Sequence, residues 1–168
     1  MNRKNYLKSV LAGLLALLLG GCASSGPGYD DTIYNRDLTP KQAAAGADSL
    51  MDEPVLWGGM IIHAVNTEQG SQLEILGYPL ASDQRPNLNA DPVGRFILVS
   101  ESFLEPLDYS EGREVTVTGS FTDTQSGEVG STNYLYPVVD AEHIHLWSRS
   151  KAYNKPQIHF GFGFVFGS

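Results

Sequence analysis

The chain has 168 residues, with 11 lysine and arginine residues against 19 aspartate and glutamate residues and a net charge of -8. This length fits one domain of ordinary size and argues against two full-sized domains. A hydrophobic fraction of 42% can supply a core. The acidic balance, with no basic run after the first residues, excludes nucleic acid as an expected partner.

Residues 1–21 have the three parts of a bacterial export signal. The basic residues Arg3, Lys4 and Lys8 precede an apolar run over residues 10–19, and small residues follow. The apolar run is too short for a membrane-spanning helix, which needs about 20 residues. We therefore expect residues 1–21 to direct export and to be removed, so that any anchor must come from another source.

Leu19, Gly20, Gly21 and Cys22 resemble the lipobox of bacterial lipoproteins. The resemblance implies that a signal peptidase recognises the first three residues and that the Cys22 thiol receives a diacylglyceryl group. Two or more acyl chains would anchor the protein stably in a membrane. Because Cys22 is the only cysteine, thiol catalysis and an intramolecular disulfide are excluded. Ala23, where an aspartate would favour retention in the inner membrane, favours the outer membrane.

The mature chain would begin with a tether and a short helix. Residues 23–37 are small and polar, which predicts no fixed structure, and we interpret residues 22–38 as a lipidated tether. Thr39 followed by Pro40 predicts an N-cap and the first position of a helix that ends near Gly46. Removal of the signal leaves 8 basic and 19 acidic residues, so an acidic body would be held away from anionic headgroups.

Residues 55–147 are typical of an all-β domain, because short apolar stretches alternate with glycine, proline, asparagine and aspartate. We predict a small OB-like β-barrel with a short N-terminal helix, and we assign the domain to residues 39–147. A Gly/Phe-rich tail follows at residues 148–168. A polar surface loop is expected at residues 81–93. The predicted strands are residues 55–66, 72–80, 95–102, 114–122, 132–141 and 143–147.

Four local patterns refine this prediction. The alternation over residues 114–118 predicts buried valines and solvent-facing threonines, and the apolar run over residues 96–99 predicts a strand covered on both faces. Gly58, Gly59 and Gly119 predict bulges or strong coiling. Pro137 predicts an edge strand or a bulge, because proline cannot donate to a strand ladder.

Six short motifs in the β domain, together with the lipobox, carry a resemblance to a known family. They are Leu56-Trp57-Gly58-Gly59, Tyr78-Pro79-Leu80, Gly94-Arg95-Phe96, Phe103-Leu104-Glu105-Pro106, Gly112-Arg113-Glu114-Val115-Thr116-Val117-Thr118-Gly119 and Tyr134-Leu135-Tyr136-Pro137-Val138-Val139. In this order they resemble the Slp family of starvation-inducible outer-membrane lipoproteins. The resemblance implies an OB-like domain anchored in the outer membrane of the cell envelope and facing the periplasm. It implies no reaction and no catalytic residues.

A metal site is one hypothesis for the domain. His143 and His145 are two residues apart in a predicted strand, so their rings would face the same side and could bind one metal ion with His63 or Asp140. The alternative is a polar strand face turned to solvent. This spacing is common, and it lacks the cysteines or the helical histidine pair of a specific zinc motif.

Enzyme activity has little support in the sequence. No Gly-Xaa-Ser-Xaa-Gly motif is present, and Ser126 is expected in a hairpin turn. Glu101 and Glu105 are interpreted as surface carboxylates. Arg95 and Arg113 are expected to bind backbone carbonyls or carboxylates in structural roles. We therefore predict that the protein is not an enzyme and has no cofactor.

Aromatic residues offer a second possible binding surface. Trp57, Tyr134, Tyr136 and Trp147 could form a face that stacks ligands, although core packing is the simpler interpretation for the two tryptophans. Tyr134 and Tyr136 are expected to share one face of a strand. Because Pro137 marks that strand as an edge, their rings could meet a partner protein.

The tail contains phenylalanine at alternate positions, so an extended chain would place all four rings on one side. Such a stripe needs a cover. It could add a strand to its own barrel, dock on the sheet edge of a partner, insert at a membrane interface or remain disordered. The residues are Phe160, Phe162, Phe164 and Phe166.

These patterns favour a non-enzymatic binding or structural module of the cell envelope. The candidate partners are the outer membrane, reached through acyl chains on Cys22, and an envelope protein, reached through the tyrosine edge or the phenylalanine tail. A module that binds a small molecule or a metal, through the aromatic face or His143 and His145, is the alternative hypothesis.

Overall fold

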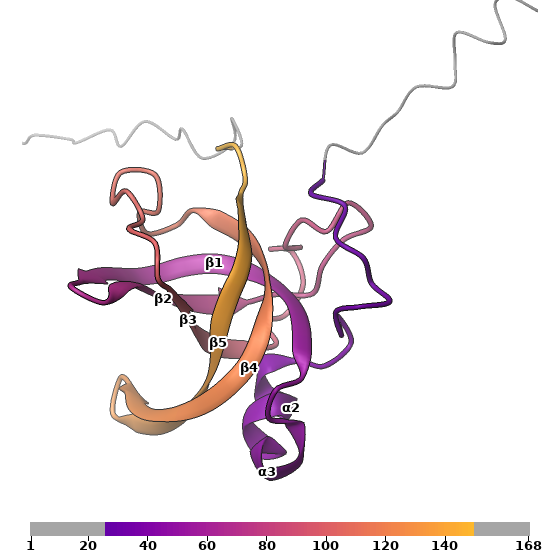
Figure 1. The fold of residues 1–168 in the computed structure, drawn as a ribbon, viewed down its shortest axis with the longest axis vertical. Helices are drawn as coiled ribbons and strands as arrows, with labels where there is room; N and C mark the ends of the chain where they lie inside the picture. Colours follow the sequence, from indigo (N-terminus) through magenta and orange to yellow (C-terminus); the bar gives the residue numbers. More distant parts are fainter. Residues whose placement is uncertain (1–25, 150–168) are drawn as a thin grey trace, which may run out of the picture.

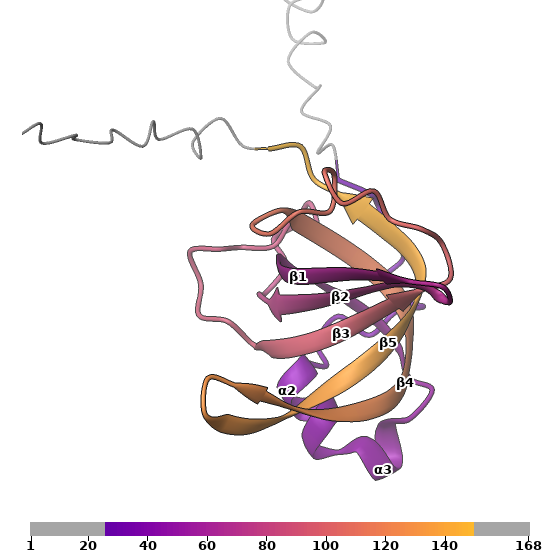
Figure 2. The same ribbon diagram turned by 90° about the vertical axis from the view of Figure 1, so that its left-hand side faces the viewer.

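The computed structural model describes residues 26–149, which form a five-stranded barrel with two short helices at one end (Figures 1 and 2). No helix in this range has the length and apolar character required to cross a bilayer. The lipobox residues and the four tail phenylalanines lie outside the described residues. The elements are α2 (Pro40–Ala45), α3 (Ala47–Leu50), β1 (Pro54–Thr67), β2 (Gly70–Gly77), β3 (Gly94–Ser100), β4 (Glu114–Val129) and β5 (Thr132–Leu146).

The strand order confirms the predicted OB-like barrel. The sheet closes in the order β1-β2-β3-β5-β4, with antiparallel neighbours except for the parallel pair of β3 and β5. The predicted helix is also confirmed. The Thr39 hydroxyl accepts from the Gln42 N–H, the Gln42 side chain accepts from the Thr39 N–H, and Gly46 follows the helix. This capping box stabilises a helix that would otherwise be too short to persist.

Strong coiling of β1 and β4 allows the sheet to close. Residues 54–60 of β1 pair with β4, and residues 59–67 pair with β2. A Cβ atom on Gly59 would overlap the carbonyl oxygen of Leu76, and one on Gly119 would overlap the carbonyl oxygen of Asp140. Gly119 also lies at a register shift between β4 and β5. The predicted role of these two glycines is confirmed, because only glycine fits at these close backbone approaches.

The core fills the interior of the barrel with branched and aromatic side chains. Phe96, Ile97 and Leu98 of β3 are all buried, which confirms a strand covered on both faces. Burial of each large side chain contributes about 1.5–3 kcal/mol to folding. The other principal core residues are Val55, Trp57, Ile61, Leu73, Ile75, Val115, Val117, Phe121 and Val139.

The predicted solvent-facing threonines of β4 are wrong, because Thr116 and Thr118 are both fully buried. The Thr116 hydroxyl donates to the carbonyl oxygen of Gln84 at 2.6 Å and accepts from the Trp147 indole N–H at 2.9 Å. The loop over residues 81–93 therefore covers this outer face of the barrel. That loop is present as predicted, but Gln84 in it is buried rather than exposed.

The β4–β5 hairpin is longer than predicted. Ser126 lies inside β4, paired with Leu135, so its expected place in a turn is wrong, and β5 is one strand rather than two. Residues 132–137 of β5 pair with β4 alone, since β3 joins β5 only at residues 138–140. Pro137 therefore lies where the hairpin leaves the barrel, which confirms the predicted edge position.

Candidate functional site

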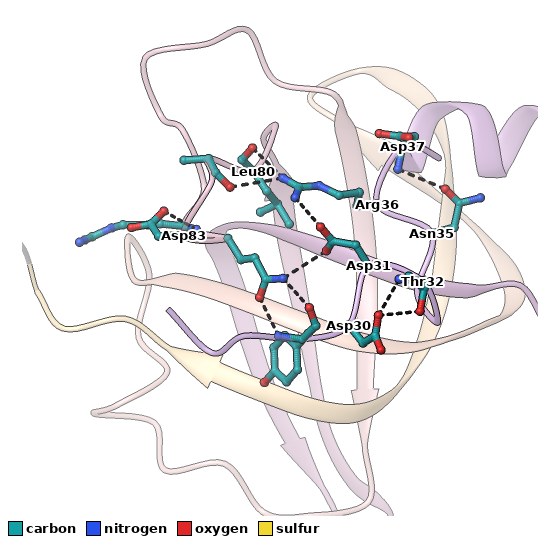
Figure 3. A network of polar contacts seen from close by, with 12 residues as sticks. Asp30, Asp31, Thr32, Asn35, Arg36, Asp37, Leu80 and Asp83 are labelled. Carbon is teal, nitrogen blue, oxygen red and sulfur yellow. Dashed lines mark hydrogen bonds and ion pairs between the residues drawn. The ribbon is translucent and has the colours of Figure 1, made fainter. Parts of the chain in front are cut away.

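Residues 26–38, which we call the N-terminal segment, lie along the barrel rather than hanging free. The Arg36 guanidinium donates to the Asp31 carboxylate at 2.9 Å and to the Leu80 carbonyl oxygen at 3.1 Å, as Figure 3 shows. Asn35 pairs with β1: its N–H donates to the Pro54 carbonyl oxygen, and its own carbonyl accepts from the Leu56 N–H. These contacts fix the middle of the segment to the barrel wall.

Two further contacts extend this attachment. The Tyr34 hydroxyl donates to the Glu142 carboxylate at 2.6 Å, and the Tyr29 ring stacks on His143 with 5.8 Å between ring centroids. The prediction that residues 23–37 form a tether without fixed structure is therefore wrong for residues 26–37. The polar groups of this segment form hydrogen bonds to the barrel.

An apolar groove lies between α2 and the β4–β5 hairpin, and we call it the α2 groove. It has a volume of about 620 Å³ and opens where the hairpin separates from β3. Leu135 lines it and is 43% exposed, and Lys41 of α2 is another exposed lining residue. The lining residues are Thr39, Lys41, Ala44, Ala45, Leu76, Pro92, Val93, Gly94, Arg95, Tyr134 and Leu135.

The two tyrosines predicted to meet a partner have different environments. Their rings meet edge to face, with 4.8 Å between centroids. The Tyr134 hydroxyl accepts from the Arg95 backbone N–H at 2.8 Å, and its ring lines the α2 groove. Tyr136 is only 5% exposed, and its hydroxyl donates to Glu74 at 3.2 Å. The predicted exposure is therefore wrong for Tyr136, whereas Tyr134 remains a candidate binding residue.

Charged groups stabilise the base of this hairpin. The Arg95 guanidinium donates to the Glu74 carboxylate at 2.6 Å, with both side chains about three-quarters buried. Burial, and secondarily the nearby Glu74 carboxylate, raises the pKa of Tyr136. The structural role predicted for Arg95 is confirmed, because its guanidinium binds the Glu74 carboxylate, which also accepts from the Tyr136 hydroxyl.

The histidines do not converge. His143 stacks on Tyr29, and the ring of His145 lies edge to face with Trp147 at 4.5 Å between centroids. His63 has its Nδ1 atom 3.9 Å from the Glu111 carboxylate. Across residues 26–149, no three histidine, cysteine, aspartate or glutamate residues are arranged to hold a metal ion.

The remaining predicted residues are structural or surface groups. Arg113 donates to the carbonyl oxygens of Asp108 at 2.7 Å and Trp147 at 3.0 Å, in agreement with its predicted role. Glu101 and Glu105 are exposed carboxylates.

The four aromatic residues proposed as one ligand face take part in three separate sets of contacts. Trp57 packs edge to face on Phe96 in the core, and Trp147 bonds to Thr116. Tyr134 and Tyr136 contact each other. Core packing of the two tryptophans is confirmed, since they are only 4% and 6% exposed.

The α2 groove was not predicted, because its walls come from distant parts of the chain. The three alanines of α2 indicate a helix but not which side remains uncovered. Pro92 and Val93 lie at the end of a loop whose other residues are mostly polar, so they do not indicate an apolar surface. Pro137 is the only sequence signal for this region, because it marks the strand that carries Tyr134 as an edge.

Comparison of sequences identifies related lipoproteins. The model of the outer membrane lipoprotein Slp family matches residues 19–166. An Escherichia coli K12 protein named uncharacterized lipoprotein YeaY is 31% identical over 149 residues, which cover 86% of this chain and 75% of that protein. The outer membrane protein Slp of the same bacterium is 27% identical over 153 residues, covering 89% of this chain and 80% of that protein.

Solved structures show a more distant likeness. The mitochondrial single-stranded DNA-binding protein Rim1 of S. cerevisiae has a TM-score of 0.37 and 13% identity, covering 60% of this chain and 99% of that chain. A small single-stranded DNA-binding protein of Streptomyces coelicolor has a TM-score of 0.37 and 14% identity, covering 56% of this chain and 94% of that chain. The OB-like assignment stands on the strand order and pairing of this barrel.

Proposed function

The chain belongs to the outer membrane lipoprotein Slp family, and we propose that it is a non-enzymatic module, anchored through Cys22 and facing the periplasm, that binds an envelope protein in the α2 groove. The single observation that carries the binding role is the opening between α2 and the β4–β5 hairpin. It joins an apolar surface to a strand edge that has no second neighbour among the described strands.

The anchoring part of the proposal is supported by the chain itself. Cys22 is the only cysteine, it follows Leu19, Gly20 and Gly21, and Ala23 follows it. Acyl chains at this position would fix the protein in the lipid, since two chains suffice for stable anchoring.

The groove suits an extended apolar segment of a partner. Residues 132–137 present the backbone groups on one side of β5, and such an edge can accept an added strand through main-chain hydrogen bonds. Leu135 and Tyr134 supply apolar and aromatic contacts beside this edge, and Ala44 and Ala45 leave room for a side chain. Pro137 ends the edge, because it has no N–H to donate.

Photo-crosslinking in living cells tests this function. A photoreactive residue at Leu135, which is 43% exposed in the groove, is compared with one at Val65, which is 42% exposed on β1. We expect a specific protein adduct from position 135 that is absent from position 65. The same adducts from both positions, or none from position 135, would contradict a binding role for the groove.

A further inference from the structure

The β3–β4 loop, residues 101–113, exposes the two least covered large apolar side chains among the described residues. Leu107 is 79% exposed and Phe103 is 67% exposed. Neither side chain belongs to the barrel core or to the α2 groove. Two large apolar side chains left mostly exposed in one loop indicate an interaction surface, because their own fold covers little of their apolar area.

The loop is fixed in place although these side chains are exposed. The Leu104 N–H donates to the Ser71 hydroxyl at 2.8 Å, and the Asn66 amide donates to the Leu104 carbonyl oxygen at 2.9 Å. Leu104 itself is buried in the core cluster. The exposure of Phe103 and Leu107 is therefore set by an ordered backbone that buries the leucine between them.

This loop lies at the end of the barrel where the described chain begins. Figures 1 and 2 show the β3–β4 loop, the start of the N-terminal segment and the end of β5 together at the top of the molecule. The two helices and the tip of the β4–β5 hairpin lie at the bottom. The exposed apolar loop and the α2 groove thus occupy opposite ends of the barrel.

Chain length limits how far this end can lie from a lipid anchor. Three residues separate Cys22 from Gly26, and a fully extended chain would span at most about 14 Å between their Cα atoms. Gln84 binds the backbone of Tyr29, so the N-terminal segment adds little length beyond this. An anchor at Cys22 would therefore hold the loop end, rather than the helix end, near the bilayer.

We propose that the β3–β4 loop is a membrane-contact surface and that Phe103 and Leu107 insert into the lipid interface beside the anchor. This inference rests on the proposed lipidation of Cys22. The loop also exposes four carboxylates, so the surface it fits is zwitterionic rather than anionic. These residues are Glu101, Glu105, Asp108 and Glu111.

Tryptophan fluorescence in vesicles tests the proposal with the full acylated chain. Phe103→Trp is compared with Leu135→Trp, which lies at the opposite end, in phosphatidylcholine and phosphatidylethanolamine vesicles that carry brominated acyl chains. Trp57 and Trp147 are buried, so the unsubstituted protein gives the background. We expect the emission added at position 103 to fall about two-fold, because an interfacial ring lies about 5–10 Å into the headgroup and acyl boundary. Emission added at position 135 should not fall.

Flotation of the same vesicles separates the two levels of the proposal. If the protein floats with the vesicles but the tryptophan at position 103 is quenched no more than the tryptophan at position 135, membrane contact by the loop is wrong and the lipid anchor still stands. A chain that fails to float contradicts both. Leu107→Trp repeats the test at a second exposed position, and phosphatidylglycerol should reduce quenching because of the loop carboxylates.

Discussion

Gln84 binds the backbone of Tyr29 from both ends of its side-chain amide. The Tyr29 N–H donates to Gln84 Oε1 at 2.9 Å, and Gln84 Nε2 donates to the Tyr29 carbonyl oxygen at 2.7 Å. One side chain thereby acts as a neighbouring strand would, across 55 residues of sequence. This pair joins the N-terminal segment to the loop that covers β4, and so links the anchor side of the chain to the barrel.

Loss of this amide should release the segment. Gln84 has a positive φ of 66° and is 6% exposed, so Gln84→Gly removes the side chain while keeping a backbone conformation that glycine adopts freely. We expect a loss of about 1–3 kcal/mol in the free energy of unfolding, because two partly buried hydrogen bonds to the Tyr29 backbone are lost and each contributes about 0.5–1.5 kcal/mol. Urea unfolding measures this loss, and protease cleavage within residues 26–38 should become faster. The exposed Gln125→Ala variant should stay within about 0.5 kcal/mol.

Closure of the barrel depends on the absence of a side chain at Gly119. Gly119→Ala places a Cβ on the Asp140 carbonyl oxygen, which is backbone and cannot move aside. We expect a cost of about 3 kcal/mol or more, since overpacking forces the backbone to shift. Gly130→Ala is the control: its φ is 63° with open space around it, so only about 1–2 kcal/mol of left-handed strain is expected. Equal costs in thermal unfolding would contradict this role of Gly119.

Alkaline pH should destabilise the hairpin through Tyr136. Its pKa is raised above the ordinary value of 10.0 by burial and by Glu74. The folded state therefore retains the phenol proton to a higher pH than the unfolded state does. The contribution of Tyr136 to the free energy of unfolding is complete below about pH 10 and is lost as the pH rises through the folded-state pKa. Tyr136→Phe should flatten the decline of unfolding free energy above pH 10. The pKa values of Tyr29, Tyr34 and Tyr109 are also raised, so some decline should remain in the variant. An unchanged slope would argue against this coupling.

Local signals predicted the elements that local forces determine. The Thr39 cap, the proline after it and Gly46 define the helix, and the apolar stretches locate β1, β2 and β3 within a few positions. They miss the last seven residues of β4 and divide β5 in two, because the outer part of the hairpin is polar. Gly59 and Gly119 indicate coiling, because glycine inside a strand allows a neighbouring backbone to approach more closely than a side chain would permit. The family motifs agree with the match of the Slp family model to residues 19–166.

Covering contacts from distant segments could not be predicted in this way. Thr116 is polar and alternates with valines, but a carbonyl oxygen from the loop at Gln84 and the indole of Trp147 bury it. Residues 26–37 have the composition of a linker, yet side-chain bonds to remote backbone fix them. The burial of Tyr136 depends likewise on Glu74, which is 62 residues away. In each case a polar residue is buried or held in place by a specific distant partner, and periodicity does not identify that partner.

The mass of the mature chain, extracted from purified outer membranes, tests the central claim most directly. We predict a polypeptide that begins at Cys22 and carries a diacylglyceryl group on the thiol, with palmitate labelling lost in the Cys22→Ala variant. A chain that retains residues 1–21, that carries no acyl group on Cys22, or that still takes up palmitate after Cys22→Ala would contradict the anchor and the orientation built on it.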